Sequence, residues 1–363
     1  MIQVLGVGFS LDQRIGSYRV EAELGPTSWG TLLQARHVVL PRRAIIKVVQ
    51  SEFAAMQPYV LQTLREACII EAIAHPGVPI VYESGVLGDR RPWFAFEWIA
   101  GSTLEELLAL GVRPAIEVAG LLRDLSDILE HAHCRGVIHC GLLPERVVIT
   151  TERRYPLCIP DWSEAIAHDA TTHLPWAAVE GSRPYRAPEL VLHEDGNCEG
   201  IDDRADMFAL GVIAYRALTG GLPFAPDHDA ASFVPAHERC PDAPPALAAI
   251  IDSLLAFDRF DRPSATEVRA GIDAVLERLP ELPPRAARRG EPRLTIVRDP
   301  EERARSSRED AAGLPAGAGS SVKDQEVVLL DQPRLRRPRW TPDVRYVETP
   351  HVEIKIVDDD RAK

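Results

Sequence analysis

Charged residues and glycines interrupt the apolar segments of this chain at places where phosphate, metal or proton chemistry can occur. Gly25 and Gly30 flank a turn between two strand-like segments, and glycine lets backbone N–H groups approach a phosphate closely. Lys47 lies in the apolar segment Ala44–Val49, and Asp161 follows another apolar segment. An ordinary hairpin or strand would explain each feature alone, so their order and spacing along the chain decide the interpretation.

The segment Gly136–Ile149 indicates how these features are related. Its frame resembles the catalytic loop of the protein kinases, H-R-D-L-x-x-x-N, followed by an apolar strand. The chemical positions of the motif are altered: His139 holds the first position, Cys140 replaces the Arg, Gly141 the catalytic Asp, Leu143 the Lys and Arg146 the metal-binding Asn. The segment keeps the spacing of the loop and lacks the side chains that perform phosphoryl transfer.

The N-terminal region resembles the small lobe of the same family. Gly25–Gly30 is similar to the glycine-rich loop that covers the phosphates of ATP, with Thr27 in place of the middle glycine. Ala44–Val49 is similar to the V-A-I-K strand, so the resemblance makes Lys47 the phosphate-pairing lysine. It makes Glu66, in a segment of helical periodicity, the ion-pair partner of that lysine.

The resemblance also implies where adenine would lie. Phe96 falls at the gatekeeper position, and the backbone of Glu97 and Ile99 would face the base. Two substitutions oppose nucleotide binding: Ile45 is larger than the alanine of the family, and β-branched Thr27 should hold the loop away from phosphates. We therefore expect either weak ATP binding or none.

Four further motifs follow in the order of the family. They are Asp161-Trp162-Ser163 for D-F-G, Gly181–Glu189 for G-T-x-x-Y-x-A-P-E, Asp206–Gly211 for D-x-W-S-L-G and Asp258–Ser264 for D-P-x-x-R-P. The resemblance makes Asp161 a weak candidate ligand for a single magnesium ion. It implies structural roles for His139 and Asp206 and a buried ion pair between Glu189 and Arg262.

These matches predict an α+β, bilobal protein-kinase-like fold, with a small β-sheet lobe that carries one helix and a larger, mainly helical lobe. We expect an N-terminal extension at 1–15, a kinase-like domain at 16–280 and a largely disordered tail at 281–363. Within the domain, the small lobe covers about 16–98 and the large lobe about 101–280. Three short apolar segments interrupt the tail, either as strand-forming linear motifs or by accident of composition.

The altered loop predicts a pseudokinase, most similar to bacterial Ser/Thr kinases. Gly141 has no side chain to accept the proton of an attacking hydroxyl, and such a general base contributes about 10²–10⁴-fold to a rate. Leu143 cannot steady a transferring phosphoryl group, and Arg146 places a cation where a metal ligand belongs. In the family, the position of Glu145 points toward peptide substrate, so it is a poor substitute for the missing base.

The predicted role is to bind or regulate a protein partner, such as a kinase or another signalling protein. One alternative is a divergent but active Ser/Thr kinase, and a second is nucleotidyl transfer on the same fold. Arg146 could itself neutralise phosphate charge and allow nucleotide to bind without metal. The sequence gives no indication of the oligomeric state.

Composition narrows the remaining classes. The formal net charge is −13, with −14 in residues 1–280 and +1 in residues 281–363, which argues against nucleic acid and against an anionic membrane as partners. No apolar segment approaches the ~20 residues that span a bilayer. The six cysteines form no C-x-x-C pair, so we expect buried, reduced thiols in a cytoplasmic protein.

Overall fold

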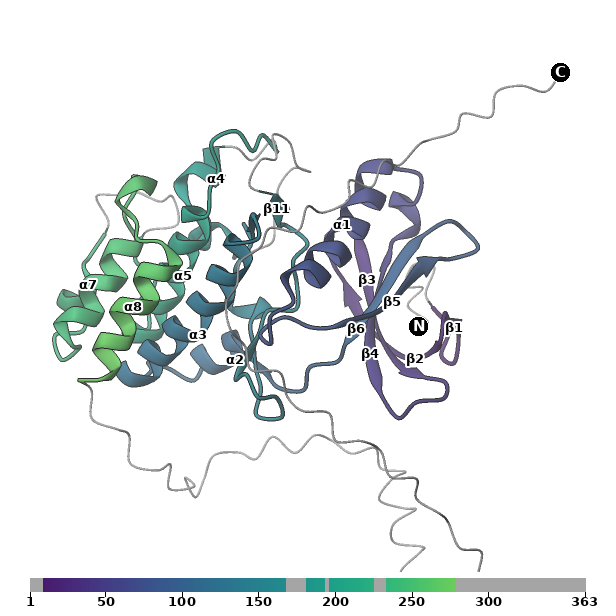
Figure 1. Ribbon diagram of the computed structural model, residues 1–363, viewed down its shortest axis with the longest axis horizontal. Helices are drawn as coiled ribbons and strands as arrows, with labels where there is room; N and C mark the ends of the chain where they lie inside the picture. The colour runs from purple at the N-terminus through teal and green to yellow at the C-terminus, as the bar shows by residue number, and fades with distance from the viewer. Residues whose placement is uncertain (1–8, 168–180, 193–195, 225–232, 279–363) are drawn as a thin grey trace, which may run out of the picture. The chain divides into compact units, whose positions relative to one another are not determined.

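The computed structural model describes residues 9–167, 181–192, 196–224 and 233–278. Figure 1 shows a lobe built on a β-sheet, in purple, and a helical lobe, in teal and green. This arrangement confirms the predicted kinase-like fold. The predicted tail and its apolar segments lie outside the described residues.

The small lobe is a six-stranded antiparallel sheet with the strand order β1-β2-β3-β4-β6-β5. Its strands are β1 (Arg14–Ile15), β2 (Tyr18–Pro26), β3 (Gly30–His37), β4 (Arg43–Val49), β5 (Val81–Val86) and β6 (Pro92–Glu97). The sheet begins inside the predicted N-terminal extension, because Ile15 is buried in the core of this lobe. The turn that resembles a glycine-rich loop therefore joins two paired strands of the sheet.

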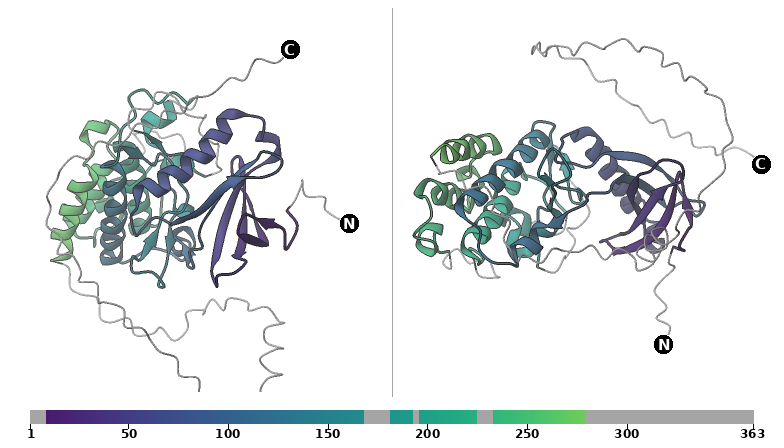
Figure 2. Two further views of the ribbon diagram at one scale, coloured as in Figure 1. Left: turned by 45° about the vertical axis from the view of Figure 1, so that its right-hand side comes forward. Right: turned by 90° about the horizontal axis from the view of Figure 1, so that it is seen from below.

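One helix, α1 (Gln57–Ile73), lies against this sheet in the views of Figures 1 and 2. Side chains alternate between the faces of a strand, and β4 follows that rule. Ile46 and Val48 enter the core on one face, whereas Lys47 lies on the other face with α1. Phe94 of β6 packs with Ile70 of the helix in the second, larger core.

The large lobe is built around α5 (Arg204–Thr219), in which nearly every side chain is buried. Amphipathic α3 (Ala115–His133) packs against both α5 and α8 (Ala265–Leu276). The other helices are α2 (Leu104–Leu108), α4 (Pro188–Leu192), α6 (Ala236–Arg239) and α7 (Pro245–Leu254). Among the described helices, none combines the length and apolar composition needed to cross a bilayer.

Four short strands hold the loops of the site in place. The loop that contains His139 and Gly141 connects β8 (Val137–Ile138) to β9 (Val148–Ile149), and it includes the 3₁₀ turn Pro144–Arg146. The segment around Asp161 connects β10 (Leu157–Cys158) to β11 (Ile166–Ala167). Because β8 pairs with β11 and β9 pairs with β10, the two loops lie next to each other.

The prediction of buried cysteines is wrong for part of the set. Cys140, Cys158 and Cys198 are buried, but Cys68 and Cys134 are exposed on helical surfaces. Cys68 falls on the outer face of α1, because its neighbours Ala67 and Ile69 take the inward positions. The prediction relied on the apolar character of the thiol, but the position of each residue on its helix decides whether these two side chains are buried.

Candidate functional site

Lys47 and Glu66 form an ion pair between β4 and α1. The Nζ atom of Lys47 donates to both carboxylate oxygens of Glu66, at 3.0 and 2.8 Å. Both side chains are buried, with exposed fractions of 3% and 2%. Burial opposes a charge on Lys47, but the neighbouring carboxylates of Glu66 and Asp161 raise its pKa. Burial raises the pKa of Glu66 to about 7, although Lys47 opposes that shift. The two hydrogen bonds hold α1 to the sheet.

Asp161 lies between two cations. Its Oδ1 atom is 3.6 Å from Nζ of Lys47, and its Oδ2 atom is 3.0 Å from Nε of Arg146. Oδ1 also accepts a hydrogen bond from the backbone N–H of Ser163. Burial alone would raise the pKa of Asp161, but Arg146 and Lys47 hold it well below its usual range. Asp161 is consequently a carboxylate whose charge is already balanced.

Arg146 projects from the 3₁₀ turn and uses all three of its nitrogens. Besides Nε on Asp161, one terminal nitrogen donates to Glu164 at 2.8 Å and the other to the carbonyl oxygen of Gly141 at 2.9 Å. The side chain is only 11% exposed. Its planar fork thus ties the altered catalytic loop to the segment that follows Asp161.

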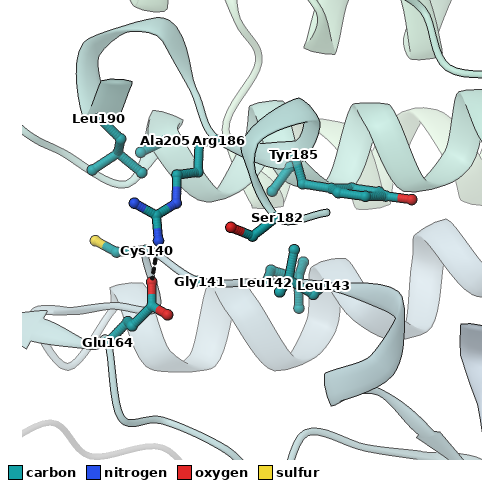
Figure 3. Close-up of a pocket in the computed structure, with 11 residues that line it drawn as sticks. Cys140, Gly141, Leu142, Leu143, Glu164, Ser182, Tyr185, Arg186, Leu190 and Ala205 are labelled. Carbon is teal, nitrogen blue, oxygen red and sulfur yellow. Dashed lines mark hydrogen bonds and ion pairs between the residues drawn. The ribbon is translucent and has the colours of Figure 1, made fainter. Parts of the chain in front are cut away.

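Glu164 is the site residue that sequence reasoning missed. It is buried and binds two guanidinium groups, Arg146 at 2.8 Å and Arg186 at 3.3 Å. Figure 3 shows its carboxylate directed at Arg186, close to Gly141 in the adjacent loop. The sequence carries no clear signal for Glu164, because this residue belongs to no motif and its two arginine partners come from other segments.

The space beside Gly141 is already filled. A Cβ atom built on Gly141 would lie 2.4 Å from Nη1 of Arg146 and 2.9 Å from Oε2 of Glu164. The pocket that Gly141 and Glu164 share with Tyr185 has a free volume of about 10 Å³, which is room for at most one water molecule. An aspartate at this position would require both charged side chains to move.

The six ionic side chains of the site form one chain of alternating charge. In order of contact they are Glu66, Lys47, Asp161, Arg146, Glu164 and Arg186. Three formal positive charges meet three formal negative charges, so the set is neutral without any ligand. Buried charges are stable only when they are paired in this way.

The backbone of the altered loop is held by Asp206 of α5. Its carboxylate accepts hydrogen bonds from the backbone N–H groups of His139 and Cys140, both at 2.8 Å, and contacts Nε2 of His133 at 2.8 Å. Cys140 has a φ angle of +58°, which is unfavourable for a side chain with a Cβ atom. Burial raises the pKa of the Cys140 thiol well above normal, so it stays protonated and cannot replace a carboxylate base.

The glycine-rich turn folds its aromatic residue into the site. Thr27 accepts a hydrogen bond from the N–H of Gly30 through its hydroxyl and so closes the turn on itself. Trp29 is 3% exposed, and its ring centroid is 6.0 Å from Nζ of Lys47. Its indole Nε1 has no hydrogen-bond partner among the described residues. Trp29 thus covers the lysine that the resemblance assigns to phosphate.

The residues predicted to face adenine lie at the end of β6. Phe96 is buried beside Phe94, and Ile45 packs against the same core. The carboxylate of Glu97 pairs with Arg153 at 3.2 Å, and Ile99 is partly exposed. These positions are compatible with a hinge, and Ile45 occupies part of the space above it.

Glu189 and Arg262 form the structural ion pair that the resemblance implies. Two nitrogens of Arg262 donate to the two carboxylate oxygens of Glu189, at 2.7 and 2.9 Å. The guanidinium also donates to the carbonyl oxygens of Arg204, Ala256 and Phe257. This pair is separate from the alternating chain of charges and fixes α4 to the segment that precedes α8.

A magnesium ion does not fit this arrangement. The sequence prediction kept one metal site at Asp161, but both oxygens of that carboxylate are engaged, one with Arg146. Arginine has no acceptor atom and cannot act as a ligand. Within the described ranges, no cluster of three or more His, Cys, Asp or Glu residues could hold a metal ion.

Comparisons with known proteins agree with this fold. A sequence profile described as "Protein kinase domain" matches residues 18–271. The chain is 28% identical over 302 residues to the serine/threonine-protein kinase Pkn1 of Myxococcus xanthus, which covers 74% of this chain and 42% of the relative. It is 30% identical over 245 residues to PknL of Mycobacterium tuberculosis, covering 67% and 58%.

The chain spans about half the length of the curated relatives that it matches. Among solved structures, the PknI kinase domain of Mycobacterium tuberculosis is similar, with a TM-score of 0.57, 22% identity and coverage of 74% of this chain and 99% of that one. This likeness concerns the fold. With the profile match across both lobes, it shows that the chain belongs to the protein kinase domain family, with bacterial Ser/Thr kinases as relatives.

Proposed function

We propose that this protein is a pseudokinase, a kinase-fold binding or regulatory protein with little or no phosphotransfer activity. The observation that carries the proposal is that the space beside Gly141 is filled by paired charged side chains. Among the residues that the structure describes, the one carboxylate that borders this space is Glu164, and it is bound by the guanidinium groups of Arg146 and Arg186. Within that part of the chain, no free proton acceptor lies where the family places its catalytic aspartate.

The neighbouring positions support the same conclusion. Leu143 is buried and apolar, so it offers no cation to a transferring phosphoryl group. Glu145 is exposed on the 3₁₀ turn. Loss of a general base alone costs about 10²–10⁴-fold in rate, and kinases begin from about 1–100 s⁻¹.

The proposed role is therefore to bind a protein partner, such as a kinase or another signalling protein, in the cytoplasm. The kinase-like domain at 16–280 would carry this function. Lys47 and Glu66 keep the clamp that phosphates use in the family, so weak ATP binding remains compatible with the site. Trp29 and Ile45 both reduce the space for nucleotide.

A phosphotransfer assay with a restored loop tests the proposal. We compare the wild type with Gly141→Asp/Arg146→Asn, which supplies the missing carboxylate and removes the guanidinium that would clash with it. With labelled ATP, Mg²⁺ and generic protein substrates, the wild type should show no turnover and the double variant should gain some. Wild-type turnover that Lys47→Ala abolishes would overturn the proposal.

The second candidate is an active Ser/Thr kinase that uses Glu164 as its base. One observation favours it: Oε2 of Glu164 lies 2.9 Å from the position that a side chain on Gly141 would occupy. Activity would then require Glu164 to leave its arginine partners. Turnover in the wild type that is lost in Glu164→Gln, while the protein stays folded, would identify this enzyme.

A further inference from the structure

The chain of alternating charge leaves no place for the metal ion that active kinases use. In the family, one Asp and one Asn hold the metal ions that neutralise the phosphates. Here the residue at the Asn position, Arg146, lies with its Nε atom 3.0 Å from the Asp161 carboxylate. A cation of the protein itself thus occupies the position beside the metal-binding carboxylate.

We propose that the Arg146 guanidinium is the permanent cation of this site and excludes divalent metal ions from Asp161. This goes further than the loss of the asparagine ligand at position 146. Arg146 also contacts Asp161, the carboxylate that would be the remaining metal ligand. The inference rests on the proposed function, since the metal-dependent phosphate transfer of the family would need the metal that Arg146 displaces.

Charge balance supports the exclusion. The six side chains from Glu66 to Arg186 are formally neutral, and most of them are buried. Adding a divalent ion would leave two uncompensated positive charges next to Arg146. Buried charge without a partner is strongly unfavourable, so metal can enter only if the arginine leaves. Leaving would break the contacts of Arg146 with Asp161, Glu164 and the Gly141 carbonyl at once.

Ligand chemistry points the same way. Mg²⁺ takes oxygen ligands at about 2.0–2.1 Å in octahedral geometry. Asp161 presents two oxygens, and each already has a donor or cation as a neighbour. Replacing Arg146 by asparagine would return a carbonyl oxygen to the site and free Oδ2 of Asp161 at the same time.

The test measures metal binding by the full-length protein without nucleotide. Thermal unfolding is followed in EDTA, MgCl₂ and MnCl₂ for the wild type, Arg146→Asn and Arg146→Lys. Bound Mn²⁺ is counted by electron paramagnetic resonance. Arg146→Lys is the matched control, because it keeps the positive charge and offers no ligand atom. Arg146→Gln replaces Arg146→Asn if that variant does not fold.

We expect metal to leave the wild type and Arg146→Lys unchanged. Arg146→Asn should bind Mn²⁺ and unfold about 2–4 °C higher at a metal concentration a few times the dissociation constant. Mn²⁺ binding by the wild type that Asp161→Asn abolishes overturns the inference. So does a failure of both Arg146→Asn and Arg146→Gln to bind metal, because Arg146 would then not be the cause.

The outcomes separate this inference from the proposed function. A wild-type protein that transfers phosphate in EDTA would refute the pseudokinase proposal and leave metal exclusion standing. A wild-type protein that binds Mn²⁺ at Asp161 and transfers no phosphate would refute metal exclusion and leave the pseudokinase proposal standing. Phosphate transfer and metal binding are measured in separate assays, so the failure of one proposal does not imply the failure of the other.

Discussion

The Oδ1 atom of Asp206 accepts a hydrogen bond at 2.8 Å from the backbone N–H of Cys140, whose φ angle is +58°. A buried carboxylate in α5 thereby stabilises a strained backbone in a loop whose motif residues at 140, 141, 143 and 146 are replaced. Asp206 binds backbone N–H groups, so its hold on the loop does not depend on which side chains the loop carries.

Asp206→Ala should destabilise the protein strongly. It leaves two buried N–H groups and His133 without their acceptor, and removing one partner of a buried ionic network costs about 3–5 kcal/mol. Arg36→Ala is the control, because its pair with Glu21 lies at the surface and should contribute about 1 kcal/mol or less. Urea unfolding curves measure both, and equal losses would contradict the anchoring role.

Gly141→Ala should be destabilising although alanine suits the backbone there. The new methyl group would meet Nη1 of Arg146 at 2.4 Å and Glu164 at 2.9 Å, so the ion pairs must shift. Overpacking of this kind costs about 1–3 kcal/mol. The matched control is Gly120→Ala in α3, where no atom lies within 4 Å and alanine should stabilise by about 0.5–1 kcal/mol. A gain at both glycines would show that the space beside Gly141 is open.

Trp29 should limit access to Lys47. Its buried ring lies over the lysine, so Trp29→Ala opens the phosphate region of the site. We expect Trp29→Ala to bind ATP more tightly than the wild type in a calorimetric titration, and Trp29→Phe to resemble the wild type. Weaker binding by the alanine variant, with its fold intact, would show that Trp29 forms part of the binding surface instead.

The contribution of Arg146 to stability should depend on pH. Its guanidinium and Lys47 lower the pKa of Asp161 below the usual 3.8, against the effect of burial. A lowered pKa stabilises the folded state at pH values above that of the unfolded carboxyl group and loses this effect as pH falls through the folded value. The difference in unfolding free energy between wild type and Arg146→Asn should therefore be constant near neutral pH.

On acidification that difference should shrink once the pH falls below the pKa of Asp161 in the folded Arg146→Asn variant, because protonation of the unfolded chain is common to both proteins and cancels. Urea unfolding at several pH values between neutral and acid measures the two proteins side by side. A difference that stays constant into the acid range would mean that Asp161 is not the group through which Arg146 stabilises the fold.

The fold was predictable because its signals are redundant. Periodic apolar residues placed α1 and α3, and motifs such as Gly181–Glu189 fixed the order of the elements. The sequence also named Lys47 and Glu66 as partners, and they lie in contact. The resemblance to the kinase family implied this pair, and the strand and the helix that carry the two residues are local features of the chain.

The state of the site was less predictable, because it depends on contacts between segments. Glu164 belongs to no motif, so its position between Arg146 and Arg186 needed the pairing of β8 with β11. The sequence indicated that Arg146 disfavours a second metal ion, but it did not show that the side chain reaches Asp161. A guanidinium can contact several groups at once, and its choice depends on three-dimensional distances.

The arrangement around Gly141 also bears on how this protein can change over generations. Restoring aspartate there alone would place a carboxyl group against Arg146 and Glu164, and restoring asparagine at 146 alone would leave Glu164 and Asp161 without a shared counter-ion. Each single replacement toward the family's catalytic loop should therefore give a less stable protein. For the pseudokinase that we propose, this makes the departure from catalysis hard to reverse one residue at a time.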